Sequence, residues 1–255
     1  MKQFAVLTLL VTLGVQALPD RSPYIVNGYP VAHQPYNAYV QYLNAVNAGY
    51  FGGGSIISNR HIITAAQNIY GFVRWDIGLG SNVYNQLSML TTTMATFHPN
   101  FNTVTRANDI GIITLMNAIS LTSTIAPISM PSLQEQYQLP LENEQGTIVG
   151  FGLTSSQSTA RSDILIRSFQ RVTAGVRCQQ YYLITIPNHF CAEDTTEISN
   201  ICNGDIGAGF ATYSGNSPLL TGIASLITSN CASGTPSAYT RIVPYRQWIQ
   251  QVTGV

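Results

Sequence analysis

Cysteine and histidine are the usual zinc ligands, and this 255-residue sequence has 4 of each. No Cys-x-x-Cys pair and no His-x-x-x-His pair occurs, so the sequence carries no local ligand pattern for zinc. An even number of cysteines in a secreted chain instead indicates two disulfides, and the spacing alone leaves three pairings open. All lie in the last third of the chain, at Cys178, Cys191, Cys202 and Cys231.

The first residues have the pattern of a secretion signal. Lys2 supplies a positive charge, an apolar run from Phe4 to Val15 follows, and a small-residue cleavage pattern ends at Ala17. The run is too short to span a bilayer comfortably, and a buried N-terminal strand is the less favoured alternative. We therefore predict a signal peptide at 1–17 and a secreted, extracellular protein.

The charge balance argues against two classes of partner. Lysine plus arginine and aspartate plus glutamate number 11 each, which gives a net charge of +0. Such a chain has no electrostatic attraction for a nucleic-acid backbone or an anionic membrane, so we expect neither partner. Lys2 is the only lysine, and arginine stays charged far above the range in which lysine titrates. An alkaline gut lumen is therefore one candidate compartment, although compositional drift is the favoured explanation.

The elements that must position these residues have the pattern of short strands. Alternating or β-branched segments recur between clusters of Gly, Pro, Asn and Ser, which is typical of an all-β sandwich or barrel. The C-terminus differs, because Tyr245, Trp248, Ile249 and Val252 recur at helical spacing before Gly254, a helix stop. The expected strands include 36–42, 55–57, 62–64, 110–113, 147–149 and 223–226.

Four stretches resemble, in order and spacing, segments of the chymotrypsin-like (trypsin-type) serine proteases. Residues 24–28 (YIVNG) resemble their activation junction, and 53–58 (GGSIIS) with 64–66 (TAA) resemble the strand pair before the catalytic histidine. Residues 108–110 (NDI) resemble the segment of the catalytic aspartate, and 202–207 (CNGDIG) resemble the loop of the serine nucleophile. The resemblance is nearest to the insect chymotrypsin and collagenase-like branch.

The resemblance covers 25–255 and implies an all-β fold of two six-stranded antiparallel β-barrels with a C-terminal α-helix. The active site of the family lies between the barrels. The implied boundaries are a short propeptide at 18–24, barrel one at about 25–131, barrel two at about 132–241 and the helix at about 244–253.

The resemblance also implies the disulfide pairing. Cys178 would bond Cys191, and Cys202 would bond Cys231. A further disulfide that the family usually has beside its histidine is missing as a pair, because its two positions hold a glycine and an asparagine, at 52 and 68.

Two of the three catalytic positions are replaced in this sequence. The mechanism needs a hydroxyl nucleophile, a base, and a carboxylate that orients the base. By resemblance Gln67 stands at the position of the histidine and Ile206 at that of the serine, while Asp109 keeps the carboxylate. A glutamine amide has no basic site near neutral pH, and an isoleucine side chain has no lone pair. The sequence therefore predicts that the protein is not an enzyme.

No other residue is a good substitute for the missing base or nucleophile. His61 lies on a predicted strand, and His98 falls in a Pro-Asn turn. His33 and His189 have the surroundings of loop residues, so we interpret all the histidines as surface or structural. Ser225 matches a family serine that hydrogen-bonds the catalytic aspartate, and we interpret it as structural too.

The specificity pocket of the family is altered as well. By resemblance, Asn200 lies at its base and Leu226 replaces a tryptophan beside it. Ile227 and Ser237 stand where active members usually have glycines along the walls. An isoleucine in place of glycine should obstruct a bulky substrate side chain.

Two further features of the family persist. The oxyanion-hole remnant would be the backbone N–H groups of Gly204 and Ile206, which need no particular side chain. Cleavage at the activation junction, between Tyr24 and Ile25, would free an ammonium that pairs with Asp205. Tyr24 suits a chymotryptic rather than a tryptic cut, and a purely structural role for Asp205 is an equally favoured alternative.

These observations predict a secreted, catalytically inactive, zymogen-like serine protease homologue that acts by binding. Its protein partner would be a protease, an inhibitor or another ligand, for which the chain serves as a regulator or decoy. The alternative is a weak or non-standard serine-type endopeptidase of the chymotrypsin family. We expect a monomer with no cofactor and no metal. Calcium in particular is not expected, because 81–86 lacks the carboxylates of the family's calcium loop.

Overall fold

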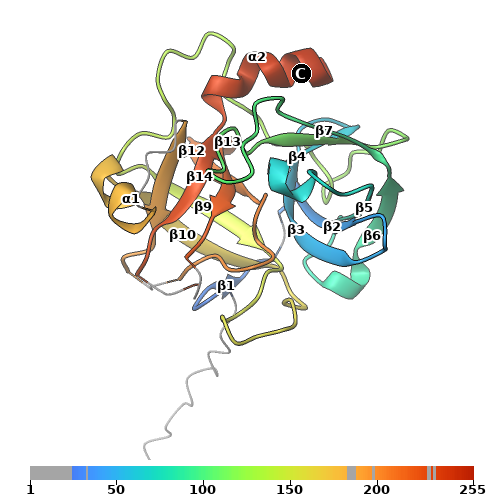
Figure 1. The fold of residues 1–255 in the computed structure, drawn as a ribbon, viewed down its shortest axis with the longest axis horizontal. Helices are drawn as coiled ribbons and strands as arrows, with labels where there is room; N and C mark the ends of the chain where they lie inside the picture. The colour runs from blue at the N-terminus through green and yellow to red at the C-terminus, as the bar shows by residue number, and fades with distance from the viewer. Residues whose placement is uncertain (1–24, 33, 183–187, 197–198, 229–230, 232–233) are drawn as a thin grey trace, which may run out of the picture.

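The computed structural model describes residues 25–255, except for 33, 183–187, 197–198, 229–230 and 232–233 (Figure 1). The predicted signal peptide at 1–17 and propeptide at 18–24, including Tyr24, lie outside the described residues, as does His33. None of the helices in the described ranges has the length and apolar character that a membrane crossing requires.

The second half of the chain forms a closed barrel of antiparallel strands. The ladder runs β9-β10-β11-β14-β13-β12 and returns to β9, while β1 (Tyr29–Pro30) adds to β10 from outside. Closure leaves no free edge among these six strands. The strands are β9 (Gln145–Gly150), β10 (Ile166–Val172), β11 (His189–Glu193), β12 (Gly209–Ser214), β13 (Ser217–Leu226) and β14 (Ser237–Arg241).

The first half forms a curled sheet in the order β6-β5-β2-β3-β4-β8-β7. The β architecture is confirmed, but this sheet has seven strands rather than six, and no ladder joins its edges β6 and β7 in the described part of the chain. Thr92 lies where β6 passes into β7, and its hydroxyl donates to Thr114 O at 2.7 Å and accepts from the Met94 N–H at 3.2 Å. The strands are β2 (Asn37–Leu43), β3 (Gly49–Ile56), β4 (His61–Thr64), β5 (Arg74–Leu79), β6 (Ser88–Thr92), β7 (Met94–Phe97) and β8 (Gly111–Thr114).

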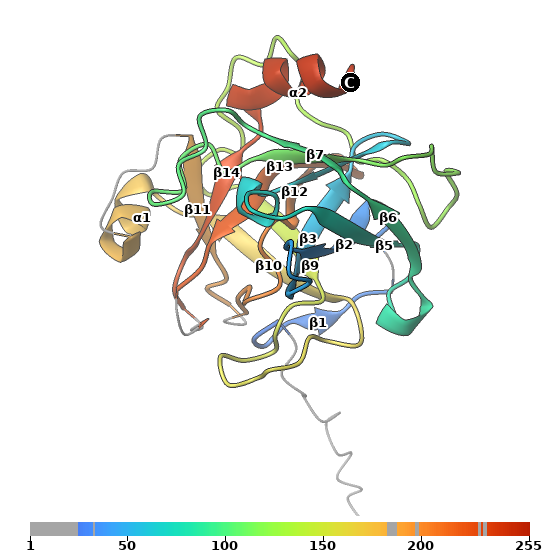
Figure 2. The same ribbon diagram turned by 45° about the vertical axis from the view of Figure 1, so that its right-hand side comes forward.

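The C-terminal helix α2 (Arg246–Thr253) follows a 3₁₀ turn, η3 (Val243–Tyr245), and lies across one end of the molecule (Figures 1 and 2). It ends as predicted at Gly254, whose φ of 75° turns the chain while its N–H bonds Gln250 O at 2.8 Å. The other helical segments are η1 (Ala66–Asn68), η2 (Tyr84–Gln86) and α1 (Gly175–Tyr182).

One core cluster joins the two sheets. Ile63 and Ile112 from the first sheet pack with Leu220 and Ile223 from the second, and Ile249 of α2 packs in the same cluster. All five side chains are fully buried, and burying each contributes about 1.5–3 kcal/mol. The sheets are therefore held as one body (Figures 1 and 2), and segments that leave them can meet at a fixed junction.

Candidate functional site

Gln67 lies in η1, the short turn that follows β4. Its main-chain N–H donates to Asp109 Oδ1 at 2.9 Å, and its side-chain Nε2 donates to Asp109 Oδ2 at 2.5 Å. The same Nε2 donates to the main-chain O of Ser225 at 2.8 Å. A primary amide has two N–H protons, so both are committed to these acceptors and Oε1 is the atom that remains.

Asp109 is fully buried just before β8. Besides the bonds from Gln67, its Oδ2 accepts from Ser225 Oγ at 2.6 Å, and its main-chain O accepts from Thr240 Oγ1 at 2.9 Å. Burial raises the pKa of the Asp109 carboxyl, and the bonds from Ser225 and Gln67 oppose that rise. The carboxylate is thus oriented by an amide and a hydroxyl, and neither is a base.

His189 belongs to the same hydrogen-bond network as Asp109, although we had predicted that His189 lies in a loop. It is the first residue of β11, and its Nε2 lies 3.2 Å from Ser225 Oγ and 3.1 Å from Thr240 Oγ1. Both hydroxyl protons already point to Asp109, so Nε2 carries the proton and donates. No spacing pattern signalled this contact, because it depends on His189 pairing with Thr240 between β11 and β14.

His61 and His98, the other described histidines, lie outside this network and have different contacts. His61 begins β4, and its Nδ1 lies 2.9 Å from Ser58 Oγ. His98 follows β7 and meets the rings of Tyr245 and Trp248 edge-on, both at 5.3 Å. Burial lowers the pKa of both imidazoles.

The loop 202–207 brings Gly204 and Ile206 to the same place. Gly204 has a φ of 93°, which favours glycine, and a Cβ there would collide with the ring of Phe51. The main-chain O of Ile206 accepts from Asn68 Nδ2 at 2.8 Å. Over the described residues, no protein group accepts the N–H of Gly204 or the N–H of Ile206.

A hydrogen bond occupies the position of the missing disulfide. A Cβ at Gly52 would lie 2.6 Å from Ile206 O and 2.7 Å from Asn68 Nδ2, so the asparagine amide uses the space that glycine leaves. Asn68 Nδ2 also donates to Thr64 Oγ1 at 3.0 Å. The loop that carries Ile206 is therefore tied to β4 and η1 by polar contacts.

A cavity of about 420 Å³ opens beside these residues. Gln67, Gly204 and Ile206 line it together with aromatic side chains from the first sheet. The rings of Tyr42 and Phe72 meet edge-on at 4.5 Å. The other wall residues include Tyr50, Phe51, Leu153 and Thr159.

Of the four residues expected at the specificity pocket, Asn200 and Ser237 are buried and bonded to each other, while Leu226 and Ile227 are partly buried. Asn200 Nδ2 donates to Thr235 O at 3.1 Å, and Asn200 Oδ1 accepts from Ser237 Oγ at 2.8 Å. Ile227 packs against the core of the second barrel. Leu226 ends β13, and its main-chain O accepts from the Tyr182 hydroxyl at 3.2 Å.

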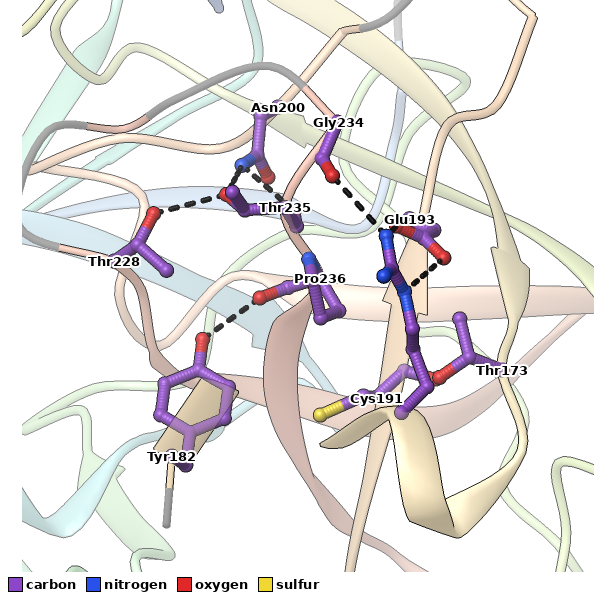
Figure 3. A network of polar contacts seen from close by, with 10 residues as sticks. Thr173, Tyr182, Cys191, Glu193, Asn200, Thr228, Gly234, Thr235 and Pro236 are labelled. Atoms are coloured by element: carbon purple, nitrogen blue, oxygen red, sulfur yellow. Dashed lines mark hydrogen bonds and ion pairs between the residues drawn. The ribbon is translucent and has the colours of Figure 1, made fainter. Parts of the chain in front are cut away.

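Figure 3 shows how densely this region is connected. Thr235 lies between Asn200 and Thr228, whose hydroxyl is 3.0 Å from that of Thr235, and the Tyr182 hydroxyl donates to Pro236 O at 2.9 Å (Figure 3). Nearby, Glu193 pairs with Arg177 at 2.9 Å.

Asp205 is fully buried and does not line the cavity; its carboxyl group packs against Gly150 and Gly152, at the end of β9. Its Oδ1 accepts from the Gly152 N–H at 2.9 Å and its Oδ2 from the Cys202 N–H at 3.0 Å. Complete burial raises the pKa of Asp205 to about 7, and these two hydrogen bonds oppose the rise. Ile25, at the expected activation junction, is fully buried as well.

The four cysteines form the two predicted disulfides. Cys178 of α1 bonds Cys191 of β11, and Cys202 bonds Cys231. The second bond fixes the start of the loop that carries Gly204, Asp205 and Ile206.

Comparison with known proteins identifies the family. The trypsin family model matches residues 25–249. This chain belongs to the trypsin family. Brachyurin of Leptuca pugilator is 33% identical over 214 residues, covering 81% of this chain and 89% of the relative. Collagenase of Hypoderma lineatum is 32% identical over 237 residues, covering 91% of this chain and 88% of the relative.

A solved structure supports the same assignment. HL collagenase matches this trypsin-family fold with a TM-score of 0.78 at 32% identity, over 90% of this chain and 98% of that chain. Chymotrypsin of Phaedon cochleariae is 30% identical over 238 residues, covering 91% of this chain and 83% of the relative. The predicted family, with its collagenase- and chymotrypsin-like branch, is confirmed.

The site of this trypsin-family chain contains hydrogen-bond donors and acceptors, and the two hydroxyls beside His189, those of Ser225 and Thr240, are buried. Gln67 is hydrogen-bonded to Asp109 and lines the cavity together with Ile206. Ser225 is buried, and its proton is held by Asp109. The arrangement can orient and hydrogen-bond a ligand.

Proposed function

We propose that this chain is a secreted, catalytically inactive serine protease homologue that binds protein as a regulator or decoy of proteolysis. The observation that carries the proposal is the Gln67 amide, which donates both its protons to Asp109 and Ser225. An amide held in this way cannot take a proton from a nucleophile, and Ile206 offers none.

The network around Asp109 supports the same view. His189 contacts this aspartate network through the hydroxyls of Ser225 and Thr240, which in turn bond Asp109. Ser225 is 1% exposed, so a substrate carbonyl has no path to its oxygen.

The specificity pocket supports binding without turnover of an ordinary substrate. Asn200 and Ser237 are buried and bonded to each other, and Ile227 packs inward on the core. A large side chain of a ligand would have to displace these groups, so its recognition falls to other parts of the cleft.

One experiment tests the proposal directly. The purified chain is incubated with a fluorophosphonate and with a broad panel of peptides, beside a Gln67→His, Ile206→Ser double variant. We expect neither labelling nor turnover by the natural sequence. Stoichiometric labelling, or turnover that persists at constant specific activity through purification, would overturn the proposal.

A weak hydrolase is the second candidate, and one observation favours it. The N–H groups of Gly204 and Ile206 lack protein acceptors in the described part of the chain, so they could polarise a carbonyl toward attack by water. Turnover that disappears with purification would instead indicate a contaminating protease and remove this alternative.

A further inference from the structure

A second hollow lies on the closed barrel, and it shares no described lining residue with the cavity beside Gln67. Its volume is about 180 Å³, less than the roughly 300 Å³ at which sites for drug-sized ligands begin, so its occupant must be small. We call it the Arg241 cleft. Its described lining includes Glu142, Val172, Gly175, Phe190, Cys191 and Arg241.

Arg241, the last residue of β14, has one edge of its guanidinium group free of protein partners. Its Nη1 donates to Gln138 O at 2.6 Å and to Pro140 O at 2.7 Å. Nε and Nη2 have no acceptor in the described chain, and together they form the edge that binds a carboxylate through two parallel hydrogen bonds. The guanidinium carbon lies 5.1 Å from the centre of the Phe190 ring, so the group is held in place from two sides.

The charge of Arg241 also lacks a counter-ion among the described residues, because none of their carboxylates forms an ion pair with it. Burial lowers the pKa of Arg241, since the charged form is partly removed from water. The guanidinium is compensated only by neutral carbonyl groups. A carboxylate at the free edge would supply the missing negative charge.

Glu142 supplies a carboxylate at the other end of the cleft. Its side chain is exposed and forms no hydrogen bond or ion pair with the described residues. The next residue, Asn143, continues the pairing of β9 with β10, because its N–H donates to Val172 O at 2.9 Å. In the barrel, β10 and β11 lie between this segment and β14, so Glu142 and Arg241 stand at opposite ends of the lining.

A free guanidinium edge and an unpaired carboxylate at the two ends of a small cleft match a small zwitterion. We propose that the Arg241 cleft binds a free α-amino acid, whose carboxylate accepts from Nε and Nη2 of Arg241 while its ammonium pairs with Glu142. Phe190 and the Cys178–Cys191 disulfide line the cleft between the two charges, so an aliphatic side chain suits it.

Free amino acids are the end products of protein hydrolysis, so this site would allow the products of proteolysis to act on the chain. The inference goes beyond the proposed function and does not depend on it, because the Arg241 cleft and the cavity have no described lining residue in common. Its failure would leave the proposed inactivity as it stands.

The test compares three ligands that differ in their charges. L-Leucine carries both charges, N-acetyl-L-leucine lacks the ammonium, and L-leucinamide lacks the carboxylate. Each is titrated into the ¹⁵N-labelled full chain while two resonances are followed, the main-chain N–H of Gly175 and the side-chain Nε–H of Arg241.

We expect leucine to bind with a Kd on the order of 1 mM, as suits so small a ligand, and to shift both resonances. Leucinamide should bind about tenfold more weakly, because it loses charge-assisted bonds to a half-buried guanidinium. N-Acetylleucine should bind about threefold more weakly, because Glu142 is exposed. Equal binding of all three ligands, or no shift of the Arg241 Nε–H at about 50 mM leucine, would overturn the inference.

A protein variant tests the second contact. Glu142→Gln removes the charge from an exposed side chain without protein partners, so the fold should not change. In this variant leucine should bind no more tightly than N-acetylleucine, while leucinamide remains the weakest ligand. Glu135→Gln is the matched control, because Glu135 precedes β9 as well but does not line the cleft, and it should keep the threefold preference. A threefold preference that persists in Glu142→Gln would overturn the assignment of the ammonium to Glu142.

Discussion

The cavity beside Gln67 is lined by part of the loop 202–207, and the expected pocket residue Asn200 lies just before that loop in the chain; their polar groups differ in how they are bonded. On the cavity side, the N–H groups of Gly204 and Ile206 have no protein acceptor in the described chain. On the pocket side, the Asn200 amide is bonded to Thr235 and Ser237.

This difference separates the polar groups that stabilise the fold from those that can bind a ligand. Buried groups that are bonded to one another contribute to folding, and removing one partner costs about 1–3 kcal/mol. Groups that open on a cavity are available to a ligand and contribute little to folding. Substitutions on the pocket side should therefore change the free energy of unfolding, and those on the cavity side should change binding.

The largest expected effect is a pH dependence of stability that arises from Asp205. Its pKa is raised by burial from 3.8 to about 7. Between these values the folded chain holds a proton that the unfolded chain has released, so the free energy of unfolding falls as pH rises, by on the order of 4 kcal/mol in total. Urea unfolding of the uncleaved chain from pH 4 to 7 measures this slope.

Asp205→Asn is the control variant. The quantity to compare is the slope of its free energy of unfolding against pH, not its absolute stability. The variant should lose most of the pH dependence whatever its absolute stability, and Asp109, whose pKa burial also raises, accounts for the remainder. Cleavage before Ile25 should also flatten the slope if the new ammonium pairs with Asp205. A slope that is unchanged in Asp205→Asn would contradict the assignment.

Gly204→Ala should destabilise the chain by about 3 kcal/mol. The substitution adds strain at a φ of 93° and drives a Cβ into the ring of Phe51. Gly215→Ala is a matched control, because its φ is 61° and a Cβ there meets nothing within 4 Å, so it should cost only about 1 kcal/mol. Equal losses in the two variants would show that packing against Phe51 does not fix the loop.

Asn200→Ala should cost about 2 kcal/mol, because it removes the hydrogen bonds to Ser237 and Thr235 inside the barrel. Chemical denaturation measures the change, with the exposed Asn85→Ala as a control that should stay within about 0.5 kcal/mol of the natural chain. A loss that small in Asn200→Ala would mean that the pocket is open to water and that the cavity and the pocket do not differ.

Much of the fold could be predicted because it depends on local patterns and on resemblance. The turn at Gly254 and the strands follow from residue types and spacing, and both disulfide pairings follow from the resemblance to the family. The passage of the chain from β6, which pairs with β5, to β7, which pairs with β8, could not be predicted, because such pairings join distant segments; Thr92 at this point bonds Thr114, 22 residues away.

The candidate site shows the same division. Resemblance was enough to bring Gln67, Asp109 and Ile206 to one place. The orientation of the Gln67 amide needed the Ser225 carbonyl, 158 residues along the chain, and the position of His189 needed the register of β11 against β14. Such contacts between distant segments leave no periodic signal in the sequence.

The smallest expected effect on folding is also the sharpest test of the cavity. Tyr50 is 55% exposed, and its ring lies 5.7 Å from that of Phe72. Tyr50→Ala should cost at most about 1 kcal/mol of stability but weaken binding of a peptide with an aromatic side chain, such as acetyl-Ala-Gly-Phe-amide, about fivefold if the peptide occupies this cavity, because an aromatic contact is worth about that much.

Calorimetric or NMR titration measures the affinity, and thermal unfolding measures the stability of the same sample. Tyr137→Ala, at a tyrosine that is 67% exposed and does not line the cavity, should change neither quantity. If Tyr50→Ala instead lowered stability as far as Asn200→Ala and left the affinity unchanged, the aromatic wall would be structural. The cavity would then belong with the pocket, as a closed part of the fold rather than a surface kept for a ligand.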